Sequence, residues 1–246
     1  MWSAMGTFPS TAWTAVSRAR SGAEPRAKEA LAFLCAAYWP PLYSFARRLG
    51  YSTDDAHDLT QGFFVLLIEK DYLGDVRLRE GRFRAFLLTS FKHFLSKERD
   101  RARAVKRGGG RVPVSIDVGE AEAKHSDGPI DTLDPEALFE RRWAVTILER
   151  AMGRLRQELE QAGRGAEFEQ LEGYLTGSEP QLRYYDVAER LETTEGAVKK
   201  MVHRLRRRYG YLLREEIGAT VAEPADIDSE LRHLLSAIRP WEPPAG

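Results

Sequence analysis

The chain has 246 residues, 43% hydrophobic and 30% charged, a composition typical of a soluble globular protein and one that excludes a disordered chain. Its length allows one large domain or two small ones. No apolar run approaches the roughly 20 residues that cross a bilayer, and the first residues lack the basic start and apolar core of a signal peptide. We therefore expect a cytoplasmic protein. The single cysteine, Cys35, cannot form an internal disulfide and lies in an apolar run, which predicts a core position.

The formal net charge of zero conceals three blocks of charge along the chain. Residues 92–111 carry eight basic residues against two acids, residues 115–140 carry eight acids against Lys124, and residues 197–214 carry seven basic residues and no acid. Two separate basic surfaces indicate two contacts with a polyanion, joined by a segment that a polyanion would repel.

Helical periodicity begins after an N-terminal extension over 1–26 and predicts a helical bundle over 27–107. The apolar residues of the first helix recur at spacings of three and four, at Ala30, Leu31, Leu34, Tyr38, Leu42, Phe45 and Leu49. Pro40 and Pro41 predict a kink or a break in this helix, and Gly50 ends it.

Two more helices complete the predicted bundle. Ser52 and Thr53 indicate the cap of the second helix, with Asp54 and Asp55 at its positive start. Its buried face is expected to hold Ala56, Leu59, Phe63 and Leu67. The third helix is predicted from about Phe83 to Arg103, with an apolar side at Phe83, Leu87, Phe91, Phe94 and Leu95.

The third helix also carries two adjacent basic stripes. One consists of Lys92, Ser96, Arg99, Arg103 and Lys106, and its neighbour of His93, Lys97 and Arg101. A basic stripe beside aromatic rings can follow single-stranded backbone while unpaired bases stack on the rings. The aromatic residues expected mainly in the core are Phe83, Phe91 and Phe94. Phe86 and His93 lie nearer the polar boundary and are the better candidates for contact with a base.

A linker rich in Gly, Pro and acid is predicted over 108–138, because no helical period is sustained there. The period resumes in a second domain over 139–217, at Trp143, Ile147, Ala151, Leu155 and Leu159, then at Phe168, Leu171 and Leu175. The sequence therefore predicts an all-α chain with two helical domains joined by an acidic flexible linker.

Residues 184–208 carry the most specific local pattern, that of a helix-turn-helix. Val187, Ala188 and Leu191 form the inner face of its first helix, and Val198, Met201, Val202 and Leu205 that of its second. Residues 192–194 make the turn, with Thr194 as N-cap and Glu192 where glycine is common. The outer face presents Glu195, Gly196, Lys199, Lys200, His203, Arg204 and Arg207. Such a helix fits the major groove of DNA, with its N-terminal residues at base edges and its cations on phosphates.

In this order the motifs resemble the extracytoplasmic-function branch of bacterial sigma factors, over residues 27–217. The stretch DAHDLTQGFF (55–64) resembles the family segment DAEDLVQEVF, and the stretch FRAFLLTSFKHFLSKERDRAR (83–103) resembles the segment for the minus-10 element. In the latter, Phe86 and His93 stand where the family usually has Trp and Asn. The helix-turn-helix resembles the domain that reads the minus-35 element, and the acidic linker resembles the segment that threads the polymerase toward its active-site cleft.

The resemblance implies a sigma region 2 bundle, a sigma region 4 domain and three binding surfaces. The residues expected to bind core RNA polymerase, through its β′ clamp helices and its β subunit, are Asp54, Asp55, Asp58, Leu59, Gln61 and Phe64. Those expected to bind minus-10 DNA are Phe86, Lys92, His93, Lys97, Arg99, Arg101 and Arg103. Those expected to bind minus-35 DNA are Thr194, Glu195, Lys199, Lys200, His203, Arg204, Arg207 and Arg208. An anti-sigma factor or another regulator is a further possible partner. No cofactor is expected.

Two other classes of function compete with this interpretation. A helix-turn-helix regulator that never joins polymerase would explain residues 184–208 but gives no role to the exposed acids of the second helix or to the basic third helix. An enzyme is disfavoured, since the five histidines are scattered and no catalytic or metal-ligating motif is present.

A C-terminal extension over 218–246 holds one further predicted helix, Asp228–Arg239, capped by Asp228 or Ser229. Its apolar stripe consists of Ile227, Leu231, Leu234, Leu235 and Ile238. A helix this short needs a partner in water. Two possibilities remain open. The helix folds back on the minus-35 domain, or it docks a regulator or masks a DNA-binding face until a signal arrives.

Overall fold

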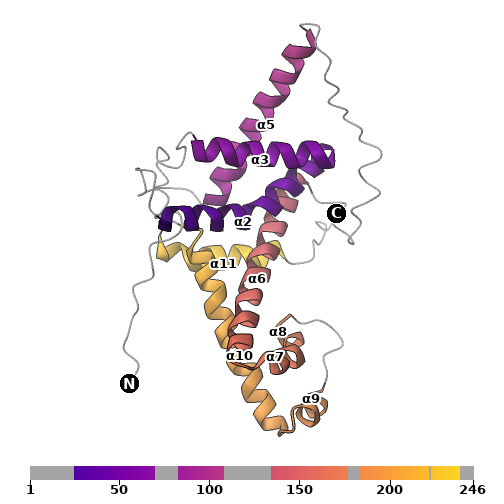
Figure 1. Cartoon of the computed structure of the whole chain (residues 1–246), viewed down its shortest axis with the longest axis vertical. Coiled ribbons are helices and arrows are strands. Elements are labelled where there is room, and N and C mark those ends of the chain that lie inside the picture. Colours follow the sequence, from indigo (N-terminus) through magenta and orange to yellow (C-terminus); the bar gives the residue numbers. More distant parts are fainter. Residues whose placement is uncertain (1–24, 70–82, 108–133, 177–182, 222, 239–246) are drawn as a thin grey trace, which may run out of the picture. The chain divides into compact units, whose positions relative to one another are not determined.

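The computed structural model is helical throughout the residues that it describes, which are 25–69, 83–107, 134–176, 183–221 and 223–238. No strand occurs among them, which confirms the all-α class. The helices are α2 (Pro25–Arg48), α3 (Thr53–Glu69), α5 (Phe83–Arg107), α6 (Pro135–Gln161), α7 (Gly165–Leu171), α8 (Gly173–Thr176), α9 (Tyr184–Arg190), α10 (Glu195–Gly218) and α11 (Ile227–Ala237), with a 3-10 turn, η3, at Pro224–Asp226 (Figure 1). No helix in these ranges is long and apolar enough to span a membrane.

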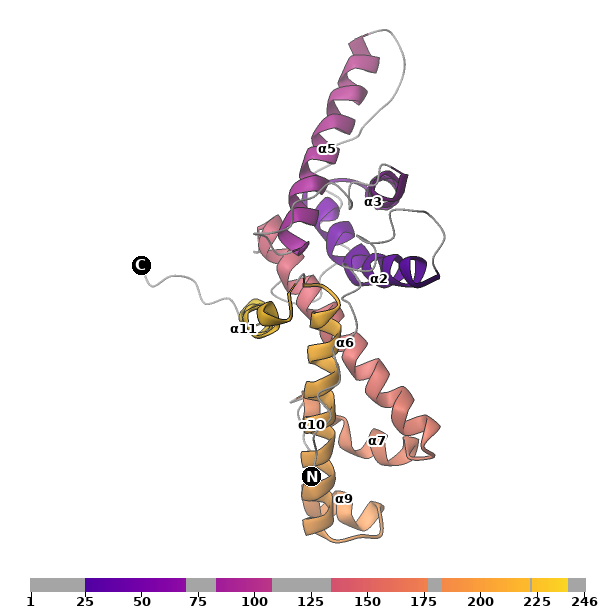
Figure 2. The same cartoon turned by 90° about the vertical axis from the view of Figure 1, so that its left-hand side faces the viewer.

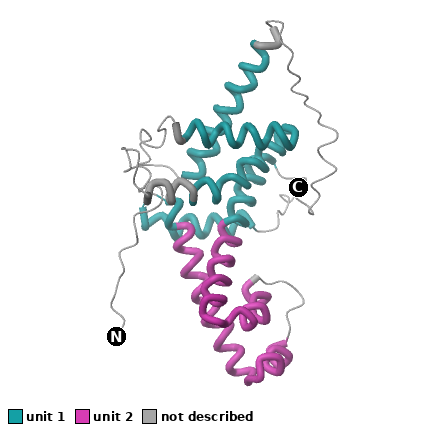
Figure 3. Tube along the Cα trace, viewed as in Figure 1, with its two compact units in different colours: residues 1–146, 218–246 teal, residues 147–217 magenta. Residues whose placement is uncertain are grey.

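The chain divides into two compact units, unit 1 (residues 1–146 and 218–246) and unit 2 (residues 147–217) (Figure 3). This division differs from the predicted domains in two places, because residues 139–146 and the C-terminal extension both belong to unit 1. Helix α6 also begins within the predicted linker, at Pro135. The rest of that linker, residues 108–133, lies outside the described residues.

Helices α2, α3 and α5 form the bundle of unit 1. Helix α2 runs through Pro40 and Pro41 without a break, and Figure 1 shows it changing direction along its length, as expected where proline removes a backbone hydrogen bond. It ends in a Schellman motif, in which Gly50 adopts a positive φ of 88° and the amide of Tyr51 donates to the carbonyl of Ala46. The predicted end of this helix is therefore confirmed.

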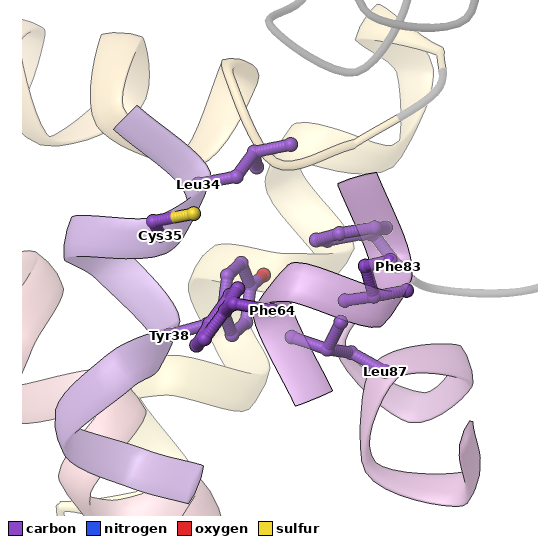
Figure 4. A pocket seen from close by; sticks show the side chains of 7 residues that line it. Leu34, Cys35, Tyr38, Phe64, Phe83 and Leu87 are labelled. Atoms are coloured by element: carbon purple, nitrogen blue, oxygen red, sulfur yellow. The ribbon is translucent and has the colours of Figure 1, made fainter. Parts of the chain in front are cut away.

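Aromatic rings fill the centre of this bundle. Phe63 of α3 and Phe91 of α5 are almost fully buried, with ring centroids 5.0 Å apart. A small pocket between the three helices is lined by apolar side chains, among them Cys35, whose thiol pKa is raised by burial (Figure 4). The predicted core of 27–107 is confirmed at most of the described positions, whereas Cys35, Leu59 and Phe94 are only half-buried and Leu49 is 40% exposed. The side chains of Ala30 and Leu31 lie outside the described residues.

A charged cluster ties α6 and α11 to α5 inside unit 1. Arg84 of α5, only 4% exposed, donates to Glu140 of α6 at 2.6 Å and to Glu230 of α11, which is 2% exposed. The guanidinium also lies 4.9 Å from the ring centroid of Trp143, and the Nε2 atom of His233 lies 2.9 Å from Glu140. A buried cation needs such partners, because an unpaired charge in an apolar interior is strongly unfavourable.

Helix α11 therefore packs within unit 1, so the prediction that it folds back on the minus-35 domain is wrong. Its apolar residues Ile227 and Leu234 are buried, as the predicted stripe requires, while Leu235 is 47% exposed. The helix begins at Ile227, directly after η3, so the predicted caps at Asp228 and Ser229 are wrong.

Ion pairs join α6 and α10 in unit 2. Glu216, 2% exposed, accepts hydrogen bonds from Arg150 at 2.8 Å and from Arg154 at 2.9 Å. Farther along both helices, Arg208 of α10 binds both carboxylate oxygens of Glu158 of α6, at 2.8 and 2.6 Å. The order of these pairs along the two helices shows that α6 and α10 run antiparallel.

Helices α9 and α10 form the predicted helix-turn-helix. Five of the predicted inner residues, Val187, Ala188, Val198, Val202 and Leu205, are buried, whereas Leu191 and Met201 are only half-buried. Thr194 caps α10, since its Oγ1 accepts the amide of Ala197 at 3.2 Å. Helix α9 ends in a Schellman motif, with Thr193 donating to the carbonyl of Ala188, and its left-handed position is Glu192, with a φ of 49°.

We predict that Glu230→Gln lowers the free energy of unfolding by about 3 kcal/mol, because it leaves the buried charge of Arg84 partly uncompensated. Urea unfolding of the full chain measures the change. Glu223→Gln, an exposed acid in the segment before α11, should have no effect. In the double variant Arg84→Met/Glu230→Leu both charges are removed, and most of the loss should be recovered. Equal stability of the Glu230→Gln and Glu223→Gln proteins would contradict the role of the cluster.

We also predict that Glu192→Gly raises the free energy of unfolding by about 1 kcal/mol. A left-handed conformation costs an L-residue about 1–2 kcal/mol, part of which glycine's greater freedom in the unfolded chain offsets. The same replacement at Glu169, an exposed residue within α7, should instead be destabilising. Thermal unfolding distinguishes them, and a fall in melting temperature for Glu192→Gly would count against strain at this turn.

Candidate nucleic-acid interface

The outer face of α10 carries a stripe of four basic side chains that we call the α10 stripe, namely Lys200, His203, Arg204 and Arg207. All four are exposed, and within the described residues none forms a hydrogen bond or an ion pair. Their spacings of three, four and seven residues place them on one side of the helix. From Lys200 to Arg207 the helix rises by about 10 Å, close to the roughly 12 Å width of the major groove of DNA.

The neighbouring cations of α10 are engaged inside unit 2. Lys199 lies 3.6 Å from Glu195 and 5.5 Å from the ring centroid of Tyr184. Arg206 donates to the carbonyl of Tyr174, in the four-residue helix α8, at 3.0 and 3.3 Å. These contacts hold α8 and α9 against α10 and leave the α10 stripe free of partners.

Arg208, a predicted DNA contact, is paired with an acid of α6 within unit 2. Its guanidinium is bound by both oxygens of Glu158, and its hydrogen bond is the main reason that the pKa of the Glu158 carboxyl is lowered. The guanidinium also lies 5.0 Å from the ring centroid of Tyr211. A pair with this bidentate geometry orients α10 on α6 and leaves Arg208 little capacity for phosphate.

Two further residues predicted to contact minus-35 DNA make their contacts within α10 itself. The hydroxyl oxygen of Thr194 is occupied as the N-cap of α10. Glu195 stands in the first turn, where its negative charge suits the helix dipole, and pairs with Lys199. The side chains that remain available on this face are those of the α10 stripe.

A second cationic surface lies on α5 in unit 1. Among the described side chains of this helix, the last buried one is that of Leu95, and Figures 1 and 2 show the last turns of α5 extending beyond α2 and α3. The free basic residues of this surface, exposed and without a partner in the described part of the chain, are His93, Lys97, Arg99 and Arg103. Two other predicted contacts are paired, Lys92 with Glu136 and Arg101 with Glu98.

Phe86 lies where an aromatic ring can serve both the core and a bound base. It is half-buried, and its ring centroid is 6.3 Å from that of Phe83, which is buried. His93 and Lys97 follow seven and eleven residues later, hence on the same side of α5. The helix thus carries a ring, an imidazole and an ammonium group along one side.

The acidic face of α3 consists of Asp54, Asp58 and Gln61, which are all exposed, Asp58 with 83% of its side chain accessible. Asp55 is half-buried and belongs to the helix cap, in which its amide donates to Ser52 Oγ at 3.1 Å and its carboxylate accepts the Ser52 hydroxyl at 2.8 Å.

Phe64, predicted at the edge of this face, is buried. It is 7% exposed, and its ring stacks on Trp39 with centroids 5.7 Å apart. At 100° per residue it lies about 80° from Asp54 around α3, whereas Val65 lies within about 20° of Asp54. Val65 is 45% exposed and extends the face in its place. Sequence reasoning missed Val65, although helical phase alone could have found it.

The described residues offer surfaces of charge and an aromatic ring for stacking. No cluster of His, Cys, Asp and Glu that could hold a metal ion occurs among the residues that the structure describes. The α10 stripe and the basic surface of α5 can each bind the backbone of a nucleic acid, and they belong to different compact units. No protein-family model, no curated protein and no solved structure matches this chain, so these surfaces themselves carry the functional argument.

Proposed function

We propose that this protein is an alternative sigma factor, which joins core RNA polymerase and directs it to promoters. The observation that carries the proposal is the α10 stripe: four exposed basic side chains without partners, on the second helix of a helix-turn-helix, while the cations beside them are held by the fold. A helix of this kind binds duplex DNA with its outer face in the major groove.

The surface of α5 supports the second half of the proposal, which is promoter melting. Holding an open strand requires cations along its backbone and rings for its unpaired bases. Lys97, Arg99 and Arg103 supply the cations, and Phe86 supplies a half-buried ring on the same helix. The unstacking of base steps costs a few kcal/mol each, and these contacts would offset it. Catalysis would belong to the polymerase.

The acidic face of α3 is the proposed docking site for the polymerase. It presents two carboxylates and an amide, with Val65 as an apolar contact at its end. Buried Phe64 supports this face from within instead of contacting the partner. The β′ clamp helices are the expected partner on the resemblance of residues 55–64 to the family segment.

A regulator that binds DNA without polymerase is the alternative, and the α10 stripe by itself suits both functions. The two proposals differ at α3 and α5, which only a sigma factor would use. Copurification of the full chain with core polymerase, followed by transcription from promoters that it selects, tests the choice. Retention of duplex binding without polymerase binding would favour the regulator.

We predict that Arg207→Ala weakens binding to every duplex sequence and reduces the slope of log K against log salt by about 0.9, the loss of one phosphate contact. Arg208→Ala is the matched control. Because Arg208 is committed to Glu158, its loss should leave the slope unchanged and cost no more than about 1 kcal/mol of stability. Fluorescence anisotropy at several salt concentrations measures both slopes. An equal fall of the salt slope in the two variants would contradict the assignment of Arg207 to DNA and of Arg208 to the fold.

We further predict that Asp58→Arg lowers affinity for core polymerase at least about tenfold, since it reverses a charge on the docking face. Glu149→Arg, an exposed acid of α6 in unit 2, makes the same charge change away from α3 and should bind normally. Calorimetric titration with core polymerase compares them. Full affinity in the Asp58→Arg protein would remove α3 from the docking site.

A further inference from the structure

The start of α6 lies against the basic helix α5 within unit 1. Glu136, in the first turn of α6, pairs with Lys92, and Glu140, one turn later, pairs with Arg84, two turns earlier on α5. The order of the pairs shows that α6 and α5 run in opposite directions here. Lys92 and Arg84 thereby receive two carboxylates from one side of α6.

The two pairs differ greatly in burial. Arg84 and its second partner Glu230 are 4% and 3% exposed at the side chain, whereas Lys92 and Glu136 are 39% and 61% exposed. An exposed pair is weak and is screened by salt, but a buried pair resists opening. The buried cluster therefore fixes the start of α6, while the Lys92–Glu136 pair can open without disturbing it.

Lys92 is the cation of its stripe that lies nearest to α6. Farther along α5, Arg99 and Arg103 continue the same stripe and have no partner in the described residues. Glu136 thus neutralises the Lys92 end of a stripe on which Arg99 and Arg103 are free. Asp134 adds a second carboxylate there, with its Oδ1 accepting the amides of Glu136 and Ala137 at 2.7 and 3.0 Å.

We propose that the first turn of α6 is an intramolecular competitor for nucleic acid on α5, held in position by α11 through the Arg84 cluster. This inference rests on the proposed function, in that α5 must bind a single strand. The Glu136 carboxylate occupies the place on Lys92 that a phosphate oxygen would take. Attachment to the same compact unit gives it a high effective concentration, so a strand must displace it. Helix α11 thereby restrains strand binding without touching DNA.

Anisotropy titration of the full chain with a labelled single-stranded oligodeoxynucleotide of mixed sequence tests the competitor. Glu136→Gln should raise affinity about fivefold at low salt, the size of a modest coupling between two ligands for one site. It should also increase the slope of log K against log salt by about 0.7, the value for one more phosphate contact on a single strand. Glu172→Gln removes a carboxylate from another exposed ion pair, with Arg156 in unit 2, and should change neither value.

The double variant Lys92→Gln/Glu136→Gln identifies the cation involved. If Glu136 acts on Lys92, the gain from Glu136→Gln disappears when Lys92 is already replaced. A gain of the same size in the Lys92→Gln background, or no gain in the wild-type background, overturns the competitor. If the wild-type chain binds polymerase and duplex DNA but Glu136→Gln does not raise single-strand affinity, the competitor is overturned and the proposed function stands. Failure of every variant to bind any DNA overturns both proposals.

Discussion

The charge of Arg84 lies in the interior of unit 1, where it is stable only with carboxylates and a ring around it. Those groups come from α6 and α11, so one side chain of α5 joins two other helices. Trp143 and Phe139 of α6, fully buried, contribute apolar packing beside these ion pairs. The ion pairs and the apolar packing together are consistent with the grouping of residues 139–146 and of the C-terminal extension with the bundle.

The basic residues of the chain perform two different tasks. Some are structural, as with Arg208 on Glu158, Arg154 on Glu215 and Glu216, and Arg206 on a backbone carbonyl. Others stand free on α10 and α5, and only these can exchange counterions for phosphate at full effect. A run of seven basic residues in 197–214 therefore overstates the binding surface. The smaller free set fits the proposed contact with a duplex better, because it occupies one side of α10.

The surfaces proposed for polymerase and for nucleic acid have a common design. Each uses a helix whose inner face is fixed by apolar packing, Phe63 in α3, Leu95 in α5 and Val202 in α10, which leaves the outer face to carry charge. The rigid inner face sets the spacing of the outer side chains. The Schellman turn between α9 and α10 requires a left-handed residue, as the turn after α2 does. Gly50 adopts that conformation without strain after α2, whereas Glu192 adopts it at a cost in stability.

The sequence by itself determined the helices, most of their ends and most of the core, because apolar spacing, caps and glycines act within a few residues of one another. Thr194 as a cap, Gly50 as a stop and the apolar side of α5 are examples. It also located the helix-turn-helix and the basic face of α5. Only the tertiary structure decided which charges are paired, since Arg84 meets Glu230 across 146 residues and Arg208 meets Glu158 across 50. It likewise placed α11 in unit 1 and buried Phe64. Those outcomes depend on packing between distant segments, which no local pattern records.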